Sequence, residues 1–194
     1  MNTTYRSNTF VPNIVFECKK LAEDYDFKDS CSDEVGRLLS VLVGQVKQGK
    51  ILEVGTGYGV GSSWIISTIA PSVEFISIDN SEEKIALVSD VIKGPQVEFV
   101  CGDWQEIINK GPFQFIFADA AVVKNKEAEM LVSTLGNGGM VLLDDFTPEE
   151  HWPEEWKGKP DLTREFWLNH PGLISTEIYL TPKTSAILAT KINI

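Results

Sequence analysis

Short runs of β-branched and aromatic residues alternate with helical patterns along the middle of this chain, and no other feature constrains the fold as much. Five runs have the length and composition of strands, at 50–54, 73–78, 96–100, 113–118 and 140–143. Helical periodicity falls between them, at 60–70, 81–92, 103–109 and 124–135. Repeated strand–helix–strand units predict an α/β fold, in which a parallel sheet carries helices on both faces.

The two ends of the chain extend this pattern. Helical patterns at 12–25 and 32–48 precede the first strand, and 173–180 with 184–191 is typical of a β-hairpin with at least one antiparallel strand. The prediction is a Rossmann-like, seven-stranded, mostly parallel sheet with a C-terminal antiparallel hairpin. One domain over 1–194 would comprise N-terminal helices (1–49), a ligand-binding core (50–145), a loop and short helix (146–172) and the hairpin (173–194).

The charge of the chain restricts its partners. Lys and Arg number 17 and Asp and Glu 28, giving a formal charge of −11, so a phosphate backbone would be repelled and a broad nucleic-acid interface is not expected. The apolar stretch 60–73 is too short to cross a bilayer, and residues 1–10 lack the pattern of a secretory signal. We expect a cytoplasmic protein without a membrane segment.

A glycine-rich loop stands where the first strand meets the next helix, in Glu53-Val-Gly-Thr-Gly-Tyr-Gly59. Glycine lets the backbone bend sharply and approach a ligand closely. The dinucleotide pattern G-x-G-x-x-G fails from Gly55, because its sixth position is Val60, and from Gly57, because its sixth position is Ser62. The pattern present is acidic-x-G-x-G-x-G. A tight turn that binds nothing is the alternative interpretation.

This motif resembles the first motif of the class I S-adenosylmethionine-dependent methyltransferases, and the resemblance runs from about residue 32 to the end. In that family the glycine loop passes beneath the methionine part of the cofactor, and the acidic residue helps to fix the amino group. The resemblance implies an S-adenosylmethionine site formed by the loop and by the ends of the next strands. Its predicted contacts are Glu53, Gly55, Thr56, Gly57, Gly59, Ser62, Asp79, Asn80, Asp103, Trp104 and Asp119. A nicotinamide enzyme is an outside alternative.

Two acidic residues at strand ends have specific predicted roles. Asp79 ends the second strand, where a carboxylate accepts both ribose hydroxyls in adenosine-binding α/β enzymes, although it could instead cap the next helix. The resemblance implies that Asp103 accepts from the exocyclic amine of adenine and that Trp104 lies near the ring. Asp103 could equally be a helix cap, and Trp104 a core residue.

The acceptor side resembles small O-methyltransferases similar to the catechol and caffeoyl-coenzyme A enzymes. Those bind a divalent cation through an Asp after strand four and an Asp-Asn pair after strand five; here Asp119, Asp144 and Asp145 match. Hard oxygen ligands suit Mg²⁺, Ca²⁺ or Mn²⁺, and such an ion would lower the pKa of an acceptor hydroxyl. Adjacent Asp144 and Asp145 reach one site only if the chain turns there, which Phe146-Thr147-Pro148 favours.

The sequence departs from that pattern at two positions. Asp145 replaces the usual Asn, and Val122 stands where the catechol enzyme has its general-base Lys. Lys124 is the nearest substitute, although a solvated lysine at a helix start is the alternative. His151, in the Pro- and Trp-rich loop 146–160, is a third candidate catalyst besides Asp119 and Lys124, and Trp152 and Trp156 could wall the acceptor pocket.

The predicted function is methyl transfer from S-adenosylmethionine to a hydroxyl of a small molecule, with a divalent cation assisting. The alternatives are a metal-independent methyltransferase, in which Asp119 or His151 acts alone, and a non-catalytic adenosyl-binding or interaction protein. The helical pattern at 12–25 could cover the cofactor or build a homodimer.

Overall fold

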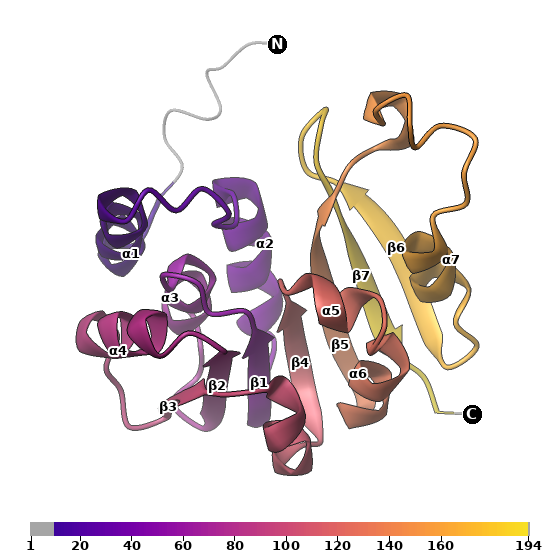
Figure 1. Cartoon of the computed structure of the whole chain (residues 1–194). Helices are drawn as coiled ribbons and strands as arrows, with labels where there is room; N and C mark the ends of the chain where they lie inside the picture. The colour runs from indigo at the N-terminus through magenta and orange to yellow at the C-terminus, as the bar shows by residue number, and fades with distance from the viewer. Residues whose placement is uncertain (1–9, 194) are drawn as a thin grey trace.

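A seven-stranded sheet forms the centre of the computed structural model, which describes residues 10–193 (Figure 1). The strand order is β3-β2-β1-β4-β5-β7-β6. The strands are β1 (Gly49–Val54), β2 (Val73–Asp79), β3 (Val97–Cys101), β4 (Phe113–Ala118), β5 (Leu135–Phe146), β6 (Leu173–Tyr179) and β7 (Ser185–Lys191). The first five pair in parallel, and β7 lies antiparallel between β5 and β6. The predicted fold class, including the C-terminal hairpin, is confirmed.

Helices cover both faces of the sheet, as the alternation of elements requires (Figure 1). One face carries α1 (Asn13–Asp24), α2 (Asp33–Val43), α3 (Val60–Ile66) and α4 (Glu82–Val91); the other carries the 3₁₀ helix η2 (Trp104–Lys110), α5 (Ala121–Lys124), α6 (Ala128–Thr134) and α7 (Leu162–Asn169). Successive β1 residues therefore serve opposite cores: Ile51 packs under α1–α4, and Leu52 packs under the second group.

The segment between β4 and β5 differs from the prediction of one helix over 124–135. Two short helices, α5 and α6, stand there, and β5 already begins at Leu135. Asn125 interrupts the first helix with φ −111° and ψ −89°, and its side-chain amide donates to the carbonyl of Ala121 at 2.8 Å. The glycines at 136, 138 and 139 disfavour continuation of the second helix. The predicted strand at 140–143 is thus only the middle of β5.

The carboxyl ends of β1, β2, β4 and β5 lie at one edge of the sheet, which is where open α/β sheets bind ligands. The acidic residues singled out in the sequence lie near the carboxyl ends of these strands or just after them, and Asp103 follows the neighbouring β3. Within residues 10–193 no helix combines the length and the apolar character needed to cross a bilayer. The predicted absence of a secretory signal concerns residues 1–10, of which 1–9 lie outside the described residues.

Candidate active site

The glycine loop leaves β1 in a backbone conformation that side-chain-bearing residues rarely adopt. Gly55 has φ +103° and Gly57 has φ +52°, and both line a cavity at the edge of the sheet. Gly59, with φ +81°, has another role, because a Cβ there would lie 2.8 Å from a methyl of Val88 on α4. Gly59 does not line this cavity, so it serves helix packing and not the direct contact that we predicted.

Glu53 lies beneath the glycine loop and does not face the cavity above it. Its side chain is fully buried; Oε2 accepts hydrogen bonds from Ser62 Oγ and, at 2.6 Å, from Ser77 Oγ. Oε1 has no hydrogen-bond partner among the described residues. Burial raises the pKa of the Glu53 carboxyl to about 7, although both serine hydrogen bonds favour the ionised form. The structure therefore places Glu53 and Ser62 as supports of the loop.

An elongated cleft follows the loop along the edge of the sheet. It consists of two cavities of about 250 and 230 Å³ that share Gly55, Asp79, Asn80 and Ala120. Gly102, Asp103, Trp104, Val122 and Glu127 line one end, and Phe27, Ser30, Cys31, Thr56 and Gly57 line the other. Of the predicted cofactor contacts, eight line this cleft: Gly55, Thr56, Gly57, Asp79, Asn80, Asp103, Trp104 and Asp119.

Asp79 lies at the middle of the cleft and braces the loop. Its Oδ2 accepts from the backbone N–H of Gly57 at 2.9 Å, and its Oδ1 accepts from that of Ser81 at 3.0 Å. Each carboxylate oxygen has a further lone pair for a ligand hydroxyl. The N-cap of α4 is Ser81, so the alternative capping role of Asp79 is wrong, and its ribose contact stays a prediction.

Asp103 and Trp104 have the cap and core roles that the sequence left open as alternatives, and both residues also line the cleft. Asp103 is the N-cap of η2 and accepts from Gln105 N at 2.9 Å, yet its exposed side chain also lines the cleft. Trp104 is 5% exposed, belongs to the core under η2 and donates its indole N–H to Glu127. Its placement leaves only the rim of the side chain for a ligand.

Sequence reasoning missed the segment that connects α1 to α2. Phe27, Asp29, Ser30 and Cys31 close the cleft opposite the glycine loop. Ser30 Oγ is buried and has no hydrogen-bond partner among the described residues. No local pattern distinguishes this serine, since its place in the site depends on α1 and α2 packing against α3.

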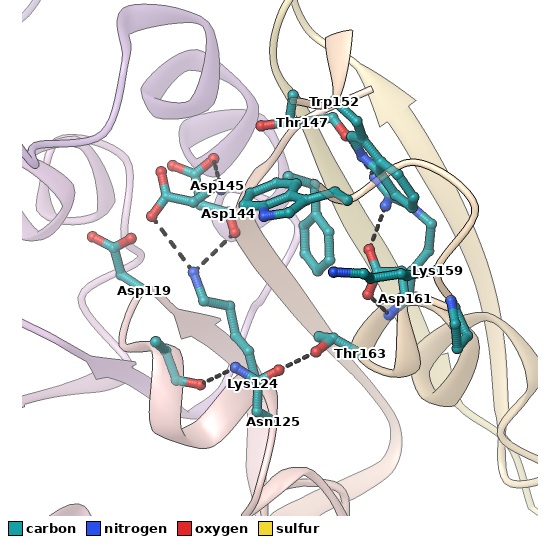
Figure 2. Close-up of a pocket in the computed structure, with 15 residues that line it drawn as sticks. Asp119, Lys124, Asn125, Asp144, Asp145, Thr147, Trp152, Lys159, Asp161 and Thr163 are labelled. Atoms are coloured by element: carbon teal, nitrogen blue, oxygen red, sulfur yellow. Dashed lines mark hydrogen bonds and ion pairs between the residues drawn. The ribbon is translucent and has the colours of Figure 1, made fainter. Parts of the chain in front are cut away.

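A larger cavity of about 580 Å³ adjoins the cleft and is lined by residues of β5, α5, α7 and the loop between β5 and α7 (Figure 2). Asp119 and Asp145 line both this cavity and the cleft. The two spaces therefore meet at these carboxylates. A small molecule in the larger cavity would lie next to whatever occupies the cleft.

Three carboxylates converge where the cavities meet. One carboxylate oxygen from each of Asp119, Asp144 and Asp145 lies within 4.8 Å of the others. Asp145 has φ +64°, its N–H donates to Asp144 Oδ1 at 2.8 Å, and the pairing of β5 with β7 shifts register between Leu143 and Phe146. The chain thus turns at Asp145 itself, one residue before the Phe146-Thr147-Pro148 turn that we predicted, and this turn brings adjacent side chains to one site.

Burial and mutual repulsion both favour the protonated form of these carboxyl groups. Burial, followed by the charges of Asp145 and Asp144, raises the pKa of Asp119 to about 8. Burial and the charge of Asp145 raise the pKa of Asp144 to about 6. Three ionised carboxylates at this spacing need nearby positive charge.

Lys124 supplies positive charge at this cluster. Its side chain is 9% exposed; Nζ donates to the carbonyl of Asp144 at 2.9 Å and lies 3.5 Å from Asp145 Oδ2 (Figure 2). Trp167 holds the backbone below it by donating to the Lys124 carbonyl at 2.8 Å. The alternative of a solvated lysine at a helix start is wrong, because α5 ends against the buried Trp167.

His151 does not join the cluster. It ends the short 3₁₀ helix η3 (Glu149–His151), is 37% exposed and approaches Glu150 at 3.7 Å. Neither the larger cavity nor the cleft includes it among its lining residues, whereas both Trp152 and Trp156 line the larger cavity. The structure gives no support to His151 as a catalyst.

Sequence comparisons relate part of the chain to known methyltransferases. Residues 51–137 match the family model described as a methyltransferase domain. A protein-L-isoaspartate O-methyltransferase of Shewanella denitrificans is 34% identical over 113 residues, which are 56% of this chain and 51% of that protein. The chain thus spans about half the length of the curated relative that it matches.

Solved structures share the whole fold. The O-methyltransferase TomG of Streptomyces achromogenes, solved with S-adenosylmethionine, superposes with a TM-score of 0.81 at 18% identity over 98% of this chain and 95% of that one. An O-methyltransferase of Bacillus cereus, solved with S-adenosylhomocysteine, gives 0.80 at 19% identity over 97% and 96%. Residues 51–137 thus match a methyltransferase domain, and the chain as a whole has the fold of these O-methyltransferases.

Proposed function

We propose that the protein transfers a methyl group from S-adenosylmethionine in the cleft to a hydroxyl of a small molecule in the 580 Å³ cavity. The observation that carries the proposal is that both spaces are lined by Asp119 and Asp145 and therefore meet at these two residues. Methyl transfer is an in-line displacement, so donor and acceptor must lie end to end with no protein between them. An adenosyl-binding protein without catalytic function would not need the second cavity.

Successive residues along the cleft would contact successive parts of the cofactor. Asp79, at its middle, would accept the ribose hydroxyls, and Asp103 with Trp104 would border the adenine. The methionine end would lie between the glycine loop and Ser30, whose buried hydroxyl lacks a partner in the described part of the chain. Thr56 and Asn80 complete the lining.

The acceptor oxygen would approach the sulfonium methyl from the side of the carboxylates. As the new C–O bond forms and the C–S bond breaks, S-adenosylhomocysteine is released and the hydroxyl loses its proton. Asp119 faces both spaces and would receive that proton, and Lys124, held against Asp144, would stabilise the negative charge on the oxygen.

The carboxylate cluster also fits a divalent cation. Three carboxylate oxygens within 4.8 Å of one another match the oxygen ligands that Mg²⁺, Mn²⁺ or Ca²⁺ prefers, and Asp119, Asp144 and Asp145 would hold the ion. A bound ion would supply Lewis-acid activation of the acceptor hydroxyl. The metal-independent route is the second candidate, because the Lys124 ammonium already lies 3.5 Å from Asp145.

Transfer of a labelled methyl group tests the proposal. The full chain is incubated with methyl-labelled S-adenosylmethionine and a panel of catechol, 3,4-dihydroxybenzoate, a simple phenol and an isoaspartyl peptide, each with Mg²⁺ or with a chelator. We expect label in an ether that survives alkaline treatment, and loss of turnover in Asp119→Asn.

The other outcomes identify the alternatives. Label in a base-labile methyl ester would point to a carboxyl acceptor, as the name of the Shewanella denitrificans relative suggests. Binding of S-adenosylhomocysteine without transfer to any acceptor would indicate an adenosyl-binding protein. Fluorescence enhancement of NADH without S-adenosylmethionine binding would indicate a nicotinamide enzyme.

A further inference from the structure

Part of the wall of the large cavity is aromatic. Trp152 and Trp156 both line it, with ring centroids 6.4 Å apart and ring planes at 77°. The Trp152 indole N–H is already bonded to the Thr147 carbonyl at 2.8 Å, and the Trp156 side chain is 50% exposed. This wall therefore offers ring surface to a planar ligand, with little hydrogen-bonding capacity of its own.

Arg164 holds this wall in place, and its guanidinium is already paired with acidic groups of the protein. Its guanidinium donates to both carboxylate oxygens of Glu177, at 3.0 and 2.9 Å, and to the Thr147 carbonyl at 3.1 Å. It also pairs with Asp161 and stacks over the rings of Phe146 and Trp152, at 5.2 and 5.6 Å. Arg164 is therefore a positioning residue for the loop.

Lys159 is the cation of this wall that remains available. It lines the cavity, is exposed, and its side chain has no ion-pair or hydrogen-bond partner among residues 10–193. Figure 2 shows its amino end directed into the cavity, with Asp119, Asp144 and Asp145 on the opposite side. Lys124, the other lysine of the lining, is engaged with Asp144 and Asp145. The cavity thus has a carboxylate cluster at one end and a free ammonium beside an aromatic surface at the other.

We propose that Lys159 selects acceptors that carry an anionic group at the end remote from the methylated hydroxyl, with a hydroxylated aromatic acid as the class that fits. The proposal rests on the proposed function. The ring would lie against Trp152 and Trp156, its carboxylate would pair with Lys159, and its hydroxyl would face Asp119. The reverse orientation would bring a carboxylate against three others, which electrostatic repulsion opposes.

A matched pair of probes isolates the anionic group. 3,4-Dihydroxybenzoate and 4-methylcatechol share the ring and both hydroxyls and differ in carboxylate against methyl. We expect kcat/KM to favour the acid about 5-fold, mostly through KM, as befits an exposed ion pair, and the preference to shrink as salt rises. Lys159→Gln should abolish the preference, Lys159→Arg should retain it, and Lys159→Glu should reverse it.

Two further variants separate the roles of charge and ring. Lys157→Gln removes a neighbouring lysine that pairs with Glu154 and does not line the cavity, so the preference should be unchanged. Trp156→Leu should weaken both probes by a similar factor and leave their ratio intact. 4-Phosphonocatechol in place of the benzoate would show whether a carboxylate or any anion is preferred.

Binding measured separately from turnover distinguishes the possible failures. Both probes are titrated into protein saturated with S-adenosylhomocysteine. Turnover of both with equal KM, or a preference that survives in Lys159→Gln, would overturn the role of Lys159 and leave methyl transfer intact. Tighter binding of the acid without turnover would support the anion site and contradict the proposed function, and binding of neither probe would overturn this substrate class.

Discussion

The ammonium of Lys124 lies 3.5 Å from the carboxylate of Asp145, across the point where the two cavities meet. Lys124 ends α5 after β4, whereas Asp145 stands in the turn within β5, so the contact joins the ends of two neighbouring strands. It supplies positive charge to a cluster of three carboxylates. In the proposed reaction this charge, alone or together with a metal ion, would activate the acceptor.

Replacing Lys124 tests its part in the reaction. Lys124→Gln keeps a donor for the Asp144 carbonyl but removes the charge, and we expect kcat to fall about 100-fold or more. Steady-state release of S-adenosylhomocysteine measures the effect. Lys126→Gln, an exposed position on the same segment, is the control and should leave kcat unchanged. Equal rates in the two variants would exclude Lys124 from the mechanism.

Addition of a divalent cation should stabilise the chelator-treated protein. At 100 times Kd, binding to the folded state alone raises the free energy of unfolding by about 3 kcal/mol, which thermal melts with Mg²⁺ or Mn²⁺ would detect. Asp144→Asn should remove the effect, and Asp90→Asn, with a side chain 87% exposed, should retain it. Lys124→Gln should bind the cation more tightly, since a neighbouring positive charge is gone. Melts that do not respond to any cation would favour the metal-independent route.

The unpartnered hydroxyl of Ser30 should affect affinity and stability differently. Ser30→Ala removes a buried donor that has no partner within residues 10–193, so we expect the free energy of unfolding to be unchanged or slightly higher. Affinity for S-adenosylhomocysteine should fall about 5-fold, the value of one hydrogen bond of about 1 kcal/mol. Calorimetric titration and denaturant melts measure the two quantities. Ser133→Ala, on exposed helical surface, should not change the affinity; unchanged affinity in Ser30→Ala would remove Ser30 from the site.

The buried Glu53 makes stability depend on pH in a defined direction. Its folded pKa, about 7, lies above the ordinary value of 4.5, so the folded state holds a proton that the unfolded chain releases first. Its contribution is fully present below pH 4.5 and is lost as pH rises through 7. In Glu53→Gln the fall in unfolding free energy between pH 5 and 8 should be smaller by about 1–3 kcal/mol.

Denaturant melts across this pH range compare wild type with Glu53→Gln, and other titrating groups cancel because both proteins contain them. Glu74→Gln, on the same sheet but 65% exposed, is the control and should follow wild type. Parallel pH curves for wild type and Glu53→Gln would show that Glu53 is ionised in the fold despite its burial.

Local sequence determined the order of the elements and the edge of the sheet where the site lies. Apolar runs such as 113–118 fix a buried strand, and the residue after a parallel strand, here Asp119, must then stand at the ligand-binding edge. The glycine loop can also be recognised in the sequence, because glycine adopts the dihedral angles of Gly55 and Gly57 far more readily than other residues. These features depend on a few neighbouring residues, so the sequence alone contains them.

Tertiary structure decided which side chains face a ligand and which support the fold. Glu53 turns under the loop, where Ser62 and Ser77 donate to its Oε2. Lys124 is buried because α7 brings Trp167 against α5, and Ser30 reaches the cleft only through the packing of α1 and α2. Asp145 joins Asp144 because β5 shifts register against β7, a strand some forty residues later. Each of these outcomes depends on partners distant in sequence, which periodicity and motif spacing do not encode.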